Sequence, residues 1–136
     1  MPRIFGLNLV ALLLATFAFF FAGFVIYGVL FSDLWMSIEG VSEEDAAAAG
    51  MGWLAPALLI TVLQVIGLGL ILQWRKAASL GAAVTTAIVA WALIALPLMA
   101  YDPIYIPGQS PMSLVIDGAH LFVGWVSSAV ILTLLK

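Results

Sequence analysis

The chain has 136 residues, of which 65% are hydrophobic and 8% are charged, and its net charge is −3. Ordinary soluble domains contain about a quarter charged residues, so this composition excludes that class and predicts an integral membrane protein. The negative charge argues against nucleic-acid binding and offers no basic patch for anionic lipid head groups, and the absence of cysteine excludes disulfides and thiolate metal sites.

Four apolar segments predict an all-α, polytopic membrane protein, an antiparallel bundle of four transmembrane helices in a single domain over residues 1–136. The helices are expected at about 4–30, 53–74, 77–99 and 111–135. The uncharged run after Arg3 is too long for the core of a signal peptide and lacks a clear cleavage site. We therefore expect this first segment to be retained as a helix.

An acidic loop follows the first segment, and Ser42-Glu43-Glu44-Asp45 within it has the pattern of a helix capping box. The acids would lie at the positive end of a helix dipole. A helix from Glu43 to Trp74 would be about 48 Å long, which exceeds the ~30 Å hydrocarbon core. It must therefore project into solvent or bend near Gly50, Gly52 and Pro56.

The second and third segments are joined by only a few residues around Arg75 and Lys76, which predicts an antiparallel helical hairpin. The third segment has small residues at every fourth position, which allow close helix approach: Ala78, Ala82, Thr86 and Ala90. Residues 101–110 are expected to form a proline-stiffened loop. Ser110 and Pro111 then supply the N-cap and first residue of the fourth helix.

The positions of the charges predict the orientation in the membrane. When the segments are counted alternately, all four cations fall on one side: Arg3, Arg75, Lys76 and Lys136. The seven acids fall on the other side or near it. The positive-inside rule then places both termini in the cytoplasm and both acidic loops outside, in a multi-pass protein of the plasma membrane.

Asp117 and His120 lie inside the fourth apolar segment, and His120 is the single histidine of the chain. An acid at mid-helix costs roughly 2.5–3.5 kcal/mol on insertion scales, less near the interface, so such residues have a partner or a task. Counted from Pro111, they lie about 9 and 14 Å along the helix, in the outer half of the bilayer. Gly124 and Ser127 or Ser128 continue the same face.

A polar pocket open to the outer face is predicted, because the other helices bring aromatic and acidic residues to the level of Asp117 and His120. These residues are Tyr27, Trp35, Trp53, Tyr101 and Asp102. One interpretation makes Asp117 and His120 a proton-exchanging or ligand-binding pair. The other makes them a structural pair that hydrogen-bonds to each other or to loop backbone.

The remaining polar residues indicate structure rather than chemistry. Asn8 and Gln64 are predicted to be interhelical polar contacts. One histidine with scattered acids gives too few ligands for a metal site, and haem held by two histidines would require a dimer. No cofactor is expected, and no catalytic motif is present.

Two stretches carry a family resemblance. They are Gly23-x-x-x-Tyr27-x-x-Leu30-Phe31-x-x-x-Trp35-Met36 and Asp117-Gly-Ala-His120, together with Asn8 in the first segment. With these residues, nearly the whole chain resembles the bacterial membrane family catalogued as domain of unknown function 1761. The resemblance implies four helices and directs attention to Asn8, Tyr27, Trp35 and His120. It implies no activity.

Three functions remain open at this level. The first is a non-enzymatic protein that acts through helix contacts, either as a homo-oligomer or as an accessory subunit of a membrane complex, with membrane lipids around it. The second is a small-molecule or proton-coupled transporter with an outer-facing polar pocket at Asp117 and His120. The third is an enzyme acting on a lipid or quinone head group, with His120 as general base. The absence of catalytic motifs favours the first.

Overall fold

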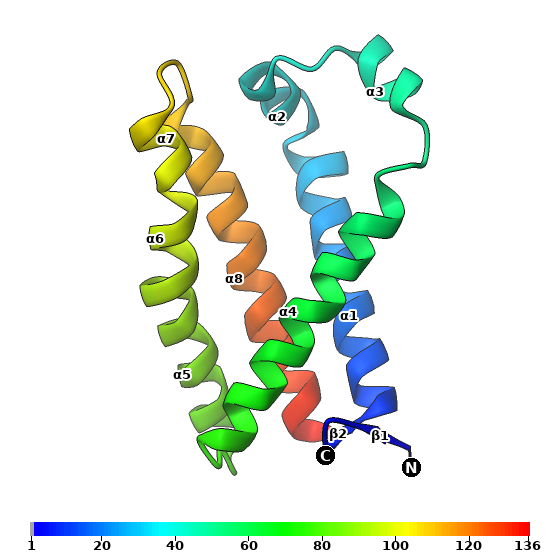
Figure 1. Cartoon of the computed structure of the whole chain (residues 1–136), viewed down its shortest axis with the longest axis vertical. Helices are drawn as coiled ribbons and strands as arrows, with labels where there is room; N and C mark the ends of the chain where they lie inside the picture. Colours follow the sequence, from blue (N-terminus) through cyan, green and yellow to red (C-terminus); the bar gives the residue numbers. More distant parts are fainter. Residues whose placement is uncertain (1) are drawn as a thin grey trace.

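The computed structural model describes residues 2–136 and is dominated by helix (Figure 1). Four helices are long and apolar enough to cross a membrane: Leu9–Leu30, Leu54–Trp74, Leu80–Tyr105 and Pro111–Leu134. This confirms the predicted all-α class with four candidate spans. The second and fourth spans begin within one residue of the predicted positions, whereas the first and third differ from prediction.

The first span begins at Leu9 and not near Ile4, because a short hairpin precedes it. Strands β1 (Arg3–Ile4) and β2 (Leu7–Asn8) pair antiparallel. Phe5 and Gly6 make the turn with φ angles of 52° and 80°. Asn8 then caps helix α1 (Leu9–Gly23), accepting a hydrogen bond from the Val10 amide at 3.0 Å. The span ends in a π-helical segment, η1 (Phe24–Leu30).

Two short helices follow at the end of the molecule away from the termini: α2 (Ser32–Glu39) and α3 (Glu43–Ala49). The predicted capping box is confirmed, since Ser42 Oγ accepts from the Asp45 amide and the Asp45 carboxylate accepts from the Ser42 amide. The helix does not continue into the second span. Gly50, with φ of 61°, ends α3, and α4 (Leu54–Trp74) begins separately.

The third span also corrects the prediction, because it runs on to Tyr105 rather than ending near Met99. It consists of α5 (Leu80–Ala90), a second π-helical segment η2 (Trp91–Ala95), α6 (Leu96–Met99) and α7 (Tyr101–Tyr105). The first half of the expected loop is therefore helical. The buried small-residue face of α5 is Ala83, Thr86, Ala87 and Ala90, so only part of the predicted stripe faces the core.

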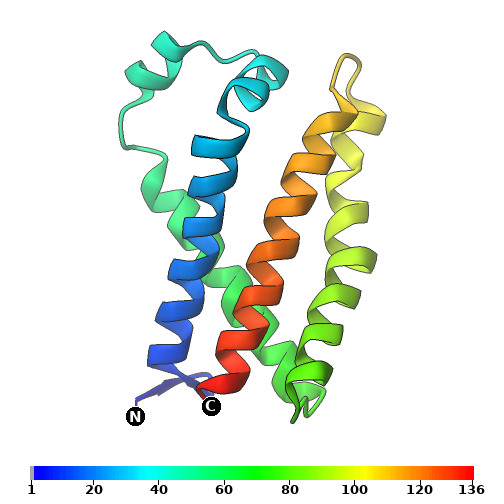
Figure 2. The same cartoon turned by 180° about the vertical axis from the view of Figure 1, so that it is seen from behind.

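Helix α8 (Pro111–Leu134) is the element against which the others pack. Figure 2 shows it between α1 and the α5–α6 segment, with α4 crossing behind all three. The closest approach is at Gly124, where an added Cβ would lie only 2.1 Å from Cδ2 of Phe19. Phe19 is 1% exposed, so a glycine at this position is what lets the aromatic ring lie against the α8 backbone.

The two ends of the molecule differ in charge. Both termini and the link between α4 and α5 lie at one end, which we call the basic end, since all four cations belong to these segments (Figure 1). Helices α2, α3 and α7 lie at the opposite end, which we call the acidic end. Six of the seven acids lie on these three helices, and Asp117 lies further inside, on α8.

Candidate functional site

The start of α8 sets the position of the polar residues near the acidic end. Ser110 caps the helix by accepting from the Met112 amide at 3.2 Å, and Pro111 occupies the first turn, as predicted. Ser113, Asp117 and His120 follow at spacings of four and three residues, so they share one face. Ser113 Oγ donates back to the Ser110 carbonyl at 2.7 Å, and its side chain is buried.

Asp117 is held from across the helix interface by Tyr27. The Tyr27 hydroxyl donates a hydrogen bond to Oδ1 of Asp117. Tyr27 belongs to the π-helical segment η1, where the wider turn changes which side chains face a neighbouring helix. This bond occupies one oxygen of the half-buried Asp117 carboxylate, and the hydrogen bonds between residues 2 and 136 assign no partner to the other oxygen.

His120 lies deeper than Asp117 and is enclosed by aromatic rings. Its ring centroid is 5.2 Å from that of Phe19 and 5.2 Å from that of Tyr27. Nε2 is buried and has no hydrogen-bond partner among residues 2–136. It faces Gly23, where an added Cβ would lie 2.9 Å away. The imidazole is therefore fitted to the glycine of α1 and is not hydrogen-bonded to Asp117.

A cavity of about 290 Å³ opens beside Asp117 at the acidic end. Helix α2 and the α6–α7 segment form it together with α8, and its lining residues are Trp35, Glu39, Met99, Asp102, Gln109, Ser113 and Asp117. Three of these residues are acids and none is a cation, so every ionisable side chain of the lining is acidic. His120 does not line it, and this geometry does not support a general-base role for His120 toward a bound head group.

The three acids surround the cavity without converging. Within residues 2–136, no group of three histidine, cysteine, aspartate or glutamate residues lies close enough together to hold a metal ion. The spacing suits a ligand that is larger than a single ion and touches the acids at separate points. Trp35 adds an aromatic face to the lining, and its ring centroid is 6.0 Å from that of Tyr27 in an edge-on arrangement.

The second π-helical segment contacts α8 one residue beyond Asp117. Trp91, the first residue of η2, donates from Nε1 to the carbonyl of Gly118 at 2.8 Å. Its ring also packs edge-on against Phe122, with centroids 5.0 Å apart. Both π-helical segments thus place a polar aromatic side chain on the same stretch of α8. Such segments occur frequently at functional sites.

One comparison identifies relatives of this chain. The model of a family described as "Protein of unknown function (DUF1761)" matches residues 10–133. The chain belongs to this family. The resemblance expected from the sequence is therefore confirmed, and all the residues discussed at the cavity lie within the matched range. No curated protein and no solved structure matches the chain.

Not every site residue predicted for this DUF1761 chain reaches the cavity. Trp35, Asp102 and Asp117 line it, and Tyr27 lies directly behind Asp117. Tyr101 does not line it: its side chain is exposed and stacks on Tyr105.

The predicted polar contacts away from the cavity have helix partners. Gln64 on α4 accepts a hydrogen bond from Nε1 of Trp125 on α8 at 2.9 Å. The Asn8 amide, which lies outside the range that the DUF1761 model matches, donates to the carbonyl of Leu135 at 2.8 Å. Both contacts connect elements that are far apart in sequence.

Several residues of the cavity were missed by sequence reasoning. Ser113 could have been found, because it precedes Asp117 by one helical turn on the same face. Glu39, Met99 and Gln109 come from three different segments, and no local pattern connects them to α8. Gly23 was named only as the first residue of the family stretch, whereas in the structure it is the surface against which His120 packs.

Proposed function

We propose that this DUF1761 protein crosses the inner membrane four times as an antiparallel bundle with both termini in the cytoplasm, and that its outer-facing cavity binds a small organic cation. The observation that carries the second part is the lining: three acids, one tryptophan and no cation around about 290 Å³. The orientation rests on the basic end, which the positive-inside rule places in the cytoplasm.

The chemistry of the cavity favours an ammonium-type ligand. Glu39 and Asp102 supply charge from α2 and α7, and Asp117 supplies charge from within α8. The Trp35 ring offers a face for a cation–π contact, which contributes roughly 0.5–2 kcal/mol. The nearest cations of the chain are at the basic end, so none competes with a ligand for these carboxylates.

Tyr27 and His120 support this site without entering the cavity. The hydroxyl of Tyr27 orients the Asp117 carboxylate and leaves its second oxygen for a ligand. His120 packs edge-on against Tyr27 and so restricts where the phenol can move. In this proposal Asp117 binds the cation, and the two rings are positioning residues.

Binding is tested with tetraethylammonium as the probe, by titrating the purified protein in detergent and following tryptophan fluorescence. We expect saturable quenching, weakened about tenfold or more by Asp117→Asn, since a charged contact becomes neutral. The matched control is Asp33→Asn, an exposed acid of α2 that does not line the cavity. Equal affinity of both variants and the parent protein for tetraethylammonium would contradict the proposal.

The orientation is tested by cysteine labelling, which the cysteine-free sequence makes unambiguous. Glu44→Cys places a thiol on exposed α3, and Ala78→Cys places one in the link between α4 and α5. In intact spheroplasts, a membrane-impermeant maleimide should label the first and not the second. The reverse pattern would refute the proposed orientation.

Transport of the bound cation is a separate step, tested by uptake of labelled tetraethylammonium into proteoliposomes with an imposed pH gradient. We expect binding without uptake, because Phe19 lies against Gly124 on the inner side of His120 and fills the space between α1 and α8. Uptake that Asp117→Asn abolishes would instead favour the transporter that the sequence analysis considered.

A second candidate function is helix-mediated association, as a homo-oligomer or as an accessory subunit. The observation in its favour is that, at Gly67 on α4 and Gly81 on α5, a Cβ would meet no atom within 4 Å beyond the backbone of its own helix and the adjacent residues, so another backbone could approach there. Native mass spectrometry of gently extracted protein tests it. A discrete complex that Gly67→Leu disrupts would support association, and a monomer carrying no partner would count against it.

A further inference from the structure

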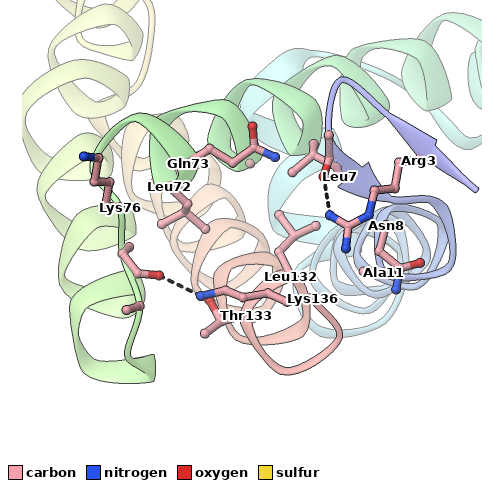
Figure 3. Close-up of a pocket in the computed structure, with 14 residues that line it drawn as sticks. Arg3, Leu7, Asn8, Ala11, Leu72, Gln73, Lys76, Leu132, Thr133 and Lys136 are labelled. Atoms are coloured by element: carbon pink, nitrogen blue, oxygen red, sulfur yellow. Dashed lines mark hydrogen bonds between the residues drawn. The ribbon is translucent and has the colours of Figure 1, made fainter. Parts of the chain in front are cut away.

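The basic end contains a second, larger cavity, of about 390 Å³ (Figure 3). Three of the four cations of the chain line it, each from a different segment: Arg3 on β1, Lys76 after α4, and Lys136 after α8. No acid lines it. Sequence composition indicated no basic patch, because the cations are few and far apart in the chain; the fold brings them together.

Two of these three cations, Arg3 and Lys136, are held by neutral groups. Nη1 of Arg3 donates to the carbonyl of Gly6 at 2.9 Å, and Nζ of Lys136 donates to the carbonyl of Ala77 at 2.8 Å. A guanidinium has five N–H donors and an ammonium has three, so each retains donors for a ligand. Neither cation forms a salt bridge with an acidic side chain among residues 2–136, so their charges are not neutralised by the protein.

Lys76 occupies a backbone position that ordinarily favours glycine. It has φ of 50° and follows the C-terminus of α4, where the Ala77 amide closes the helix by bonding to the Leu72 carbonyl at 3.0 Å. A lysine with left-handed backbone is uncommon, and its charge is also favourable beside the C-terminus of a helix. Figure 3 shows its amino group on the opposite side of Lys136 from Arg3.

The remaining lining combines polar groups with an apolar floor. Gln73 and Thr133 add an amide and a hydroxyl, and Thr133 Oγ1 is buried without a hydrogen-bond partner among residues 2–136. The floor consists of buried apolar side chains: Leu7, Ala11, Leu72 and Leu132. Trp74 is 76% exposed in the last turn of α4, which is typical of a side chain at the membrane interface.

We propose that this cavity binds the phosphate of an anionic phospholipid of the inner leaflet. The shared chemistry is a phosphate anion, which arginine and lysine bind through charge-assisted hydrogen bonds. A phospholipid fits better than free phosphate, because the apolar floor can contact the glycerol and the first methylenes of the acyl chains. Basic pockets between transmembrane helices on the cytoplasmic side are where such head groups bind.

The test is native mass spectrometry of the full-length protein in detergent, titrated with phosphatidylglycerol and, separately, with phosphatidylcholine. We expect a one-to-one adduct with phosphatidylglycerol. It should persist under conditions in which the adduct with phosphatidylcholine dissociates. Arg3→Gln with Lys136→Gln should weaken it about 30-fold, since each cation near an anionic surface contributes roughly a fivefold factor.

The matched control is Arg75→Gln. Arg75 is the fourth cation and lies at the same end, but it does not line the cavity, and its Nη1 donates to Thr86 Oγ1 at 3.1 Å. This variant should bind phosphatidylglycerol within about twofold of the parent protein, because the charges that line the cavity are unchanged. A second control combines Arg3→Lys with Lys136→Arg, which conserves both charges. This variant tests for a folding defect and should retain the adduct.

Three outcomes would overturn the proposal. One is an equal loss of phosphatidylglycerol binding in Arg75→Gln, which would make the effect one of overall surface charge. Another is equal retention of phosphatidylcholine, which would make charge irrelevant. The third is displacement of the lipid by millimolar inorganic phosphate, which would identify the ligand as free phosphate rather than as a phospholipid. None of these measurements involves the cavity at Asp117.

Discussion

The two ends of the molecule each have a cavity lined by charges of one sign. At the acidic end, Glu39, Asp102 and Asp117 surround about 290 Å³, and at the basic end Arg3, Lys76 and Lys136 surround about 390 Å³. The net charge of −3 hides this separation completely. In a chain with so few charges, the position of each charge along the molecule therefore says more about possible binding sites than the net charge does.

The two cavities also differ in how they are built. The acidic cavity has one charged residue within a candidate membrane span, Asp117, whose carboxylate accepts a hydrogen bond from Tyr27. The cations of the basic cavity are terminal or loop residues, and Arg3 and Lys136 are anchored by backbone carbonyls. The charges at the basic end would serve both the proposed orientation and the proposed lipid contact, whereas the charges at the acidic end surround the proposed cation site.

The largest effect is expected from removing the difference in the number of cations between the two ends. One variant combines Arg75→Gln and Lys76→Gln with Glu43→Lys and Glu44→Lys. It has equal numbers of cations at both ends. Because lysine and arginine bias sets orientation, roughly half the molecules should insert with the opposite topology, as measured by maleimide labelling at Ala78→Cys.

Glu43→Gln with Glu44→Gln is the control for this exchange. It removes the acids without adding cations and should leave the topology unchanged, because acids contribute little to the rule. If the four-residue exchange also left every molecule in one orientation, the segregation of charge would not be what orients this protein.

The next largest effect is expected from a substitution in the tightly packed middle of the molecule, between the two ends. Gly124→Ala would place a Cβ 2.1 Å from Cδ2 of Phe19, so the helices α1 and α8 would have to separate. We expect a destabilisation of about 3 kcal/mol, measured as a lower melting temperature in detergent. Phe19→Leu in the same chain should recover part of the loss.

Gly67→Ala is the comparison for this substitution. Gly67 lies within α4, and an added Cβ would meet no atom within 4 Å beyond the backbone of its own helix and the adjacent residues. Since alanine favours helix over glycine, stability should be unchanged or higher by about 0.5–1 kcal/mol. Equal losses from both substitutions would show that the contact between Phe19 and Gly124 is not what limits packing.

The sequence predicts features that depend on local patterns, but not contacts between residues that are far apart in the chain. The four apolar spans, the Ser42 capping box and the Ser110–Pro111 start of α8 are local patterns, and all three are present. The Tyr27–Asp117 bond joins residues 90 positions apart and depends on a π-helical segment, which hydrophobic periodicity does not reveal. Sequence reasoning could place Tyr27 at the correct level but could not choose its partner.

The same limit applies to the basic cavity. Alternate counting of the spans assigns Arg3, Lys76 and Lys136 to one side, but only the packing of α4 and α8 beside the β1–β2 hairpin determines that they line one cavity. The hairpin itself was missed, because Phe5 takes a left-handed backbone conformation with φ of 52° that its residue type does not suggest.

A smaller effect is expected from breaking the hydrogen bond between Tyr27 and Asp117 at the acidic end. Tyr27→Phe removes the donor and leaves Oδ1 of half-buried Asp117 without its partner, at a cost of about 1–2 kcal/mol. Asp117→Asn keeps an oxygen that can accept from the phenol, so it should cost less. Melting temperatures of the two variants measure this order, and a larger loss from Asp117→Asn would contradict it.

The smallest effect is expected in α3, on the surface of the acidic end. Hydrogen bonds from Ser42 lower the pKa of Asp45, the side-chain bond contributing most. Because the pKa in the folded state is below the unfolded value, the cap stabilises α3 above the unfolded pKa and is lost as the pH falls through the folded pKa.

We therefore expect the protection of the Asp45 and Ala46 amides against hydrogen exchange, corrected for the intrinsic rate, to fall between pH 6 and about pH 3. Ser42→Ala removes the hydroxyl that bonds to Asp45 and should make protection low at both values. Protection that is the same at both pH values in the parent protein would mean that α3 is held by something other than its cap. Since no residue of α3 is buried, the structure offers no packing contact for that role.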